Sequence, residues 1–106
     1  MIELNIYKKG SKKEIEKTHR VEGYELMLGT VDDFMNIIDL EKLADKGEAA
    51  KMLTKCYRQL MPLLKDIFPE VTDEELKRVK VNELVKTFMQ VGTAIVDGFD
   101  VLKQGN

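Results

Sequence analysis

Apolar and polar residues alternate in two stretches near the start of the chain, a pattern typical of a β-hairpin. Ile2, Leu4 and Ile6 are the apolar positions of the first stretch, and the second covers residues 14–21, after a polar turn that contains Gly10. The second strand carries mainly polar residues, so we expect it to be mostly solvated. Because a two-stranded hairpin is only marginally stable on its own, the apolar face of the first strand should pack against another element.

The pattern then changes to apolar residues three or four positions apart, which predicts helices. The first predicted helix covers residues 24–38 and passes through Gly29 at a cost of about 1 kcal/mol. A shorter helix capped by Thr30 is the alternative, and we favour the longer one because its apolar stripe is unbroken. The stripe consists of Tyr24, Leu28, Val31, Met35 and Ile38. A short helical turn over residues 39–44 should follow, and then a loop at residues 45–47.

A second long helix is predicted over residues 48–68. Its apolar positions cover about half of the circumference, which is more than a typical surface helix needs to bury. They are Ala49, Leu53, Cys56, Leu60, Leu63, Leu64 and Ile67. Pro62 has no amide hydrogen to donate to the Arg58 carbonyl, so we expect a kink or a restart there, and Pro69 should end the helix.

A capping box follows, with Thr72 as the cap and Glu75 as the residue that reaches back to it. The last helix is predicted over residues 82–103, and Gly92 lies in the middle of its apolar face, where a neighbouring helix can approach closely. That face consists of Leu84, Phe88, Val91, Ile95, Phe99 and Leu102. The predicted fold is α+β and mainly helical, a single domain over residues 1–106 in which an N-terminal β-hairpin packs on about four α-helices.

Composition narrows the class of protein. The 106 residues are 43% hydrophobic, enough for a packed core, and 17 basic against 19 acidic residues leave a net charge of −2. A dedicated nucleic-acid binder usually carries a clear basic excess. No apolar run approaches the roughly 18 to 20 residues of a membrane span, and a single cysteine is typical of a reducing compartment. We therefore expect a soluble intracellular protein without membrane attachment.

The residues that usually carry chemistry fit structural roles. The single histidine, His19, lies among charged residues on the predicted second strand, and we interpret it as solvated. Cys56 falls on an apolar helix stripe, where it acts as a small hydrophobe. Asp32 and Asp33 fit the N-terminal part of a helix better than a metal site. We therefore expect no enzymatic activity, no metal and no cofactor.

Methionine is frequent for so small a domain and falls on or beside the helical stripes. Met side chains either fill a core or line a groove that adapts to other chains. The candidate positions for partner binding and self-association are Met52, Met61, Met89, Phe99 and Leu102. The wide apolar faces of the two long helices suit helix-in-groove binding, and they also suit a homo-oligomer.

Several segments together resemble a known family. They are residues 37–43, IIDLEKL, residues 57–69, YRQLMPLLKDIFP, and the stretches VTDEEL at 71–76 and VKVNELV at 79–85. They resemble the tail assembly chaperones of long-tailed phages and prophages of Gram-positive bacteria. The resemblance implies a non-enzymatic protein of the host cytoplasm that is absent from the mature virion. Its partners would be the tape measure protein, which it keeps soluble, and the major tail protein, which it helps to recruit.

Two other functions stay open. A small nucleic-acid-associated regulator would bind through a basic cluster at the predicted hairpin tip, Lys8, Lys9, Lys12 and Lys13. No aromatic residue lies among these lysines, so we interpret them as solvated surface and do not expect nucleic acid as a partner. The other alternative is an unrelated phage scaffold or adaptor domain.

Overall fold

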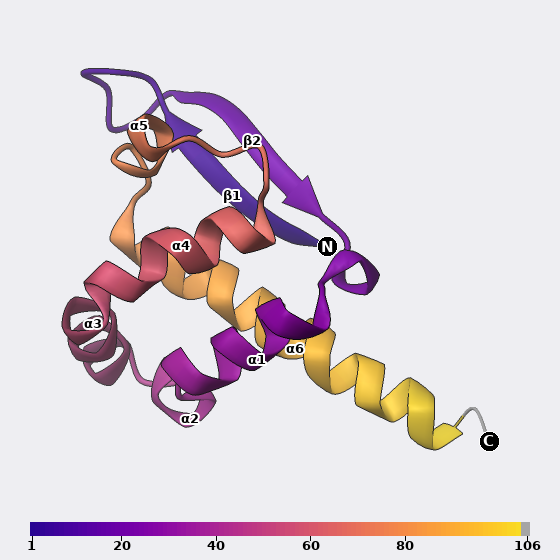
Figure 1. Cartoon of the computed structure of the whole chain (residues 1–106). Coiled ribbons are helices and arrows are strands. Elements are labelled where there is room, and N and C mark those ends of the chain that lie inside the picture. Colours follow the sequence, from indigo (N-terminus) through magenta and orange to yellow (C-terminus); the bar gives the residue numbers. More distant parts are fainter. Residues whose placement is uncertain (105–106) are drawn as a thin grey trace.

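The chain folds into an antiparallel β-hairpin that lies across a group of helices (Figure 1). The computed structural model describes the backbone of residues 1–104 and the side chains of residues 1–97. The elements are β1 (Ile2–Tyr7), β2 (Ile15–Val21), the 3₁₀ turn η1 (Gly23–Glu25), α1 (Leu28–Ile37), α2 (Leu40–Leu43), α3 (Lys46–Lys55), α4 (Tyr57–Ile67), α5 (Asp73–Leu76) and α6 (Val81–Gln104). The prediction of a mainly helical α+β fold with an N-terminal hairpin is confirmed.

The hairpin packs on α6, as its apolar face requires. Ile2, Leu4 and Ile6 are at most 1% exposed. One side of β1 pairs with β2, and side chains of α6 form hydrogen bonds with the backbone of β1 as well. The Thr87 hydroxyl donates to the Glu3 carbonyl over 2.7 Å, and the Glu3 amide donates to the Gln90 side chain over 2.9 Å. These bonds fix the hairpin on the helix, because a buried polar group without a partner would cost about 1 to 3 kcal/mol.

The middle of α6 is the centre of the core. Phe88 and Val91 are almost fully buried, and the Phe88 ring lies 5.9 Å from the Phe34 ring of α1. Gly92 faces α2, where a Cβ atom would come within 2.8 Å of Leu40. The predicted close approach at this glycine is confirmed, and so is burial of Leu84, Phe88, Val91 and Ile95.

The first predicted helix is wrong at its start. The chain forms η1 and a bend before α1 begins at Leu28, so neither a start at residue 24 nor one at Thr30 is correct. Gly23 packs so closely against α6 that a Cβ atom there would lie 2.7 Å from the Ala94 Cβ. This contact holds η1 against α6, and α1 begins only after it, at Leu28. As a result Phe34 and Ile38 are buried, whereas half of Met35 is exposed.

The second predicted helix is divided, but at a different position. It breaks at Cys56, with φ −102° and ψ 19°, into α3 and α4, and Pro62 lies inside a continuous α4. Helix α3 packs on α2 and α6 whereas α4 packs on α1, and one straight helix cannot reach both surfaces. The expected restart at Pro62 is therefore wrong. The predicted end near Pro69 is confirmed, since α4 stops at Ile67.

Candidate partner-binding groove

Met52, one of the predicted contact residues, belongs to the core. Its side chain is 9% exposed, and its sulfur accepts a hydrogen bond from the Asp39 amide over 3.2 Å. The break at Cys56 orients α3 so that this methionine lies under the start of α2. Met52 is therefore buried in the core and is not part of an exposed surface, contrary to what the helical stripe suggested.

Met61 lies in an apolar groove that several elements build together. Helices α3 and α4 form one wall, and α5, the segment after it and the start of α6 form the other. The groove has a volume of ≈ 270 Å³. Its lining residues are Leu53, Thr54, Tyr57, Leu60, Met61, Leu64, Leu76, Lys77, Val79, Val81 and Leu84. Lys77 is the one charged residue among them, so this surface can bury another apolar chain but offers little polar chemistry.

Two large side chains stand at the mouth of the groove because of where their helices begin. Tyr57 is the first residue of α4 and Val81 the first residue of α6. They are 64% and 63% exposed. The capping box predicted at Thr72 is confirmed, with the Glu75 amide donating to the Thr72 hydroxyl over 3.1 Å and the Thr72 amide donating back to Glu75 over 3.0 Å. This box starts α5, which supplies the wall opposite Met61.

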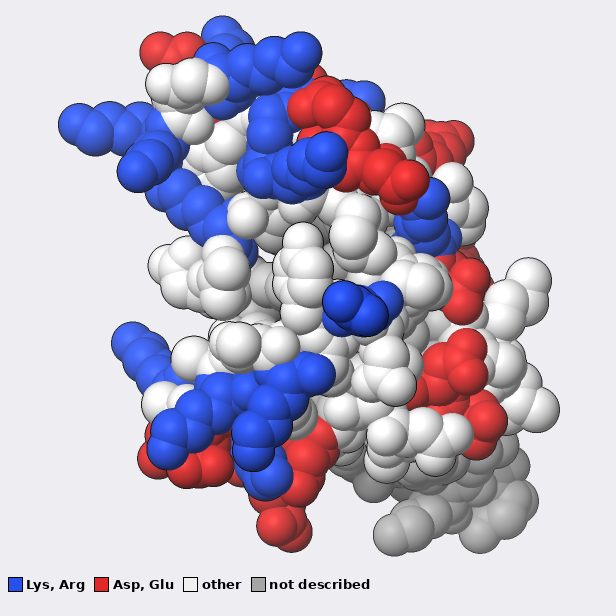
Figure 2. All heavy atoms as spheres, turned by 60° about the vertical axis from the view of Figure 1, so that its left-hand side comes forward, with Lys and Arg blue, Asp and Glu red and all other residues white. Residues whose placement is uncertain are grey.

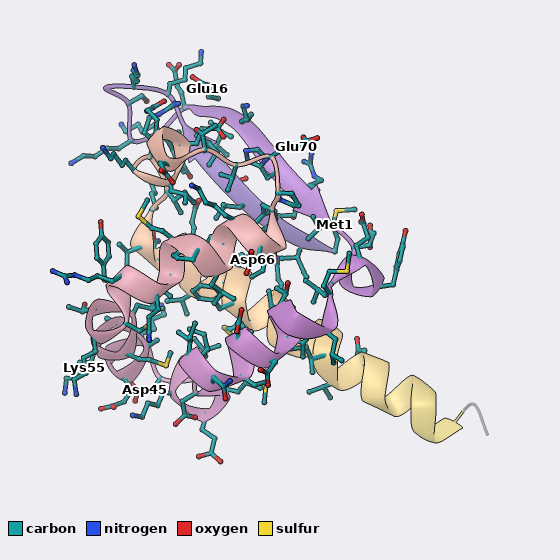
Figure 3. All side chains as sticks on the ribbon, viewed as in Figure 1. Met1, Glu16, Asp45, Lys55, Asp66 and Glu70 are labelled. Atoms are coloured by element: carbon teal, nitrogen blue, oxygen red, sulfur yellow. The ribbon has the colours of Figure 1, made fainter. Side chains whose placement is uncertain are left out.

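Basic residues border the groove at both ends. A hollow beside Val79 and Val81 is lined by Lys8, Lys12, Lys77, Arg78 and Lys80, and a hollow beside Tyr57 by Lys55 and Arg58. Within the described residues, no Asp or Glu lines the groove or either hollow. Figure 2 shows two groups of blue side chains, each with red side chains beside it, and largely uncharged surface between them. Figure 3 places Lys55 beside α3, far from Glu16 at the hairpin.

The hairpin turn is held next to the groove by Arg78. The Tyr7 amide donates to the Arg78 carbonyl over 3.0 Å, and the Arg78 guanidinium donates to the Tyr7 carbonyl over 2.6 Å. The same guanidinium pairs with Glu16 at 3.2 Å and Glu74 at 2.8 Å. The hydrogen bonds that this guanidinium donates to the Glu74 and Glu16 carboxylates raise the pKa of Arg78 further above its ordinary value. The structure thus brings two lysines of the turn, Lys8 and Lys12, to one end of an apolar surface, which the sequence did not reveal.

Met89 lies in a second, more open groove, between α2 and α6. Its side chain is 48% exposed, and the groove has a volume of ≈ 310 Å³. The lining residues are Leu40, Leu43, Ala44, Met89, Gly92, Thr93, Val96 and Asp97. Met89 is therefore accessible to a partner, as expected. Phe99 and Leu102, the other two predicted contact residues, lie outside the described side chains.

The structure has a third apolar surface that the sequence pattern did not predict. Tyr24, Met27 and Leu28 are 73% to 87% exposed, although Tyr24 and Leu28 were assigned to a buried stripe. The bend between η1 and α1 turns them outwards. The sequence signal nearest to this bend is Gly29, an unfavourable helix residue that in the structure lies in the first turn of α1.

His19 is not solvated, contrary to the sequence interpretation. Its side chain is 10% exposed, its Nε2 atom lies 3.2 Å from a Glu75 carboxylate oxygen, and its ring lies 6.3 Å from that of Phe68. Glu75 itself is buried and also pairs with Lys17 at 2.7 Å. The hydrogen bond from Lys17, with others from the Thr72 amide and His19, lowers the pKa of Glu75 to about 2 despite its burial. This cluster joins β2 to α5 and so supports one wall of the groove.

The remaining chemical groups are few. Among the described residues no group of three His, Cys, Asp or Glu side chains is placed to hold a metal ion. Cys56 is half-buried at the break between α3 and α4, and burial raises the pKa of its thiol. A raised pKa keeps the thiol protonated and unreactive near neutral pH.

Within the described part of the chain, no helix is long and apolar enough to cross a bilayer. Comparisons with protein-family models, with curated proteins and with solved structures gave no match. The groove and its basic borders are therefore the observations on which a function must rest.

Proposed function

We propose that this chain is a tail assembly chaperone of a long-tailed phage or prophage. It binds the tape measure protein in the host cytoplasm, keeps it soluble, helps to recruit the major tail protein and leaves before the virion is complete. The observation that carries the proposal is the apolar groove around Met61, together with the family resemblance of the residues that form it. Leu60, Met61 and Leu64 belong to one resembling segment, and Leu76 and Val79 to the next two.

The groove suits a long amphipathic helix, the kind of partner that a tape measure protein provides. An uncovered apolar stripe aggregates, and burying it is worth about 25 cal/mol per Å² of apolar surface. A groove of aliphatic side chains with a methionine covers such a stripe without demanding one sequence, so that many copies can bind along one rod. Exposed apolar surface outside the groove, such as Met89 in the second groove, favours self-association on the same rod.

The test is co-expression with the tape measure protein from the same genome, followed by measurement of how much of that protein stays soluble. Tyr57→Asp and Val81→Asp place a charge at the mouth of the groove. Both residues are the first of their helices, where an acidic side chain is stabilised by the positive end of the helix dipole. These variants should therefore remain folded and yet release the tape measure protein into aggregates.

Leu28→Asp is the matched control. Leu28 is also the first residue of a helix and is 85% exposed, but it lies outside the groove. This variant should keep the tape measure protein soluble. If Tyr57→Asp and Val81→Asp retain full solubilising activity, or if only Leu28→Asp loses it, the groove does not hold the tape measure protein.

A further inference from the structure

We infer that the groove around Met61 takes an amphipathic helix with acidic residues along both edges of its apolar stripe. The inference depends on the proposed function only for the identity of the protein that supplies this helix. The occupant follows from two features that lie side by side: an apolar centre and basic ends. Neither was visible as one surface in the sequence, because the lining residues are spread from Lys8 to Leu84.

The centre of the surface requires an apolar ligand. Leu60 and Leu64 are 4% and 3% exposed and form its floor, and Tyr57 and Val81 remain about two-thirds exposed at its mouth. Covering large apolar side chains in that position with another apolar surface removes them from water, which is favourable. The walls are helical, and a helix laid between them can present residues at spacings of three and four to the floor.

The ends of the surface require negative charge. Lys55, Arg58 and Lys77 are exposed, and none of them forms an ion pair with another residue of the described range. Lys12 and Lys77 both line the hollow at the hairpin end. The protein as a whole has a net charge of −2, so this basic surface is a local asymmetry rather than a general property. Complementary charge around an apolar contact selects the partner and sets its orientation.

A nucleic acid fits this surface less well. Proteins that bind single strands combine basic grooves with several aromatic faces on which bases stack. Here Tyr57 is the one aromatic residue of the central groove, and its floor is aliphatic. An aliphatic floor would remove water from the phosphates without providing a charged or hydrogen-bonding partner for them. A protein helix uses both the floor and the basic ends.

The experiment uses two synthetic 18-residue peptides, each about 27 Å long as a helix. Both carry the same stripe of Leu and Met at spacings of three and four, and they differ only in the flanking residues, Glu in one and Lys in the other. The full chain should bind the Glu peptide at least about 10-fold more tightly at low salt. The difference should shrink at about 1 M salt, where the Debye length is about 3 Å. Fluorescence anisotropy measures both affinities.

Charge reversal identifies the surface. Arg58→Glu with Lys77→Glu should reverse the preference in favour of the Lys peptide. Lys42→Glu with Lys46→Glu makes the same change in charge at exposed positions away from the groove and should keep the preference for the Glu peptide. Circular dichroism establishes that both double variants are folded.

The inference is overturned by equal binding of the two peptides, by binding of neither, or by tighter binding of a single-stranded 20-nucleotide DNA. Its failure is distinct from that of the proposed function. If the Glu peptide is preferred but the tape measure protein still aggregates, the chaperone function fails and the acidic helix remains the ligand. If the tape measure protein stays soluble but the peptides bind equally, the groove ligand is not acidic.

Discussion

Substitution by alanine should destabilise the protein strongly at Met52 and hardly at all at Met89, although their sequence contexts are similar. Each lies on a helix, so truncation to alanine changes helix propensity equally in both. Met52 is 9% exposed, and loss of a buried Met side chain costs about 2 to 5 kcal/mol. Met52→Ala should fall in the upper part of that range, because the Asp39 amide also loses its acceptor. Met89 is 48% exposed, and Met89→Ala should change stability by no more than about 0.5 kcal/mol.

Urea unfolding followed by circular dichroism measures this difference. The midpoint for Met52→Ala should fall clearly with an unchanged slope, and its Tm should drop by about 8 °C or more for a loss of about 2 kcal/mol. Met61→Ala should lie between the two, since Met61 is half-buried. Equal losses for Met52→Ala and Met89→Ala would refute the assignment of one methionine to the core and the other to the surface.

Three further experiments test contacts between elements of the fold. The pKa of Glu75 is about 2, against an ordinary 4.5. Its ionised form therefore stabilises the fold above about pH 4.5, and this stabilisation is lost as the pH falls towards 2. The difference in unfolding free energy between wild type and Glu75→Gln, measured by urea titration, should shrink over that range. Thr72→Ala removes the cap of α5 and should cost about 0.5 to 2 kcal/mol in thermal unfolding. Gly23→Ala should cost about 1 to 3 kcal/mol by forcing η1 away from Ala94, and Ala94→Gly in the same chain should make the combined loss less than additive; full additivity would show that the two residues do not touch.

The candidate site was only partly visible in the sequence. Met61 and Met89 were chosen because they lie on helical stripes, and both line grooves in the structure. The same criterion selected Met52, which is buried, since a stripe predicts that a side chain faces something but not whether that is the core or a partner. Nothing in the sequence indicated that Lys8 and Lys12 of the hairpin turn lie beside the groove. That position depends on Arg78, which lies about 70 residues further along the chain and binds the backbone of Tyr7.

Local patterns determined the elements of this protein, because strand alternation, capping and helical spacing depend on neighbouring residues. The strands, the capping box at Thr72 and the buried face of α6 around Phe88 follow from the sequence for this reason. Tertiary packing alone decided where the longer helices begin and break. Close contact between Gly23 and Ala94 ended the first apolar stripe, and the need for α3 and α4 to cover different surfaces placed the break at Cys56 rather than at Pro62. The groove depends on the second of these, because α3 and α4 form one wall and the later segments α5 and α6 form the other, and no local pattern specifies their relative positions.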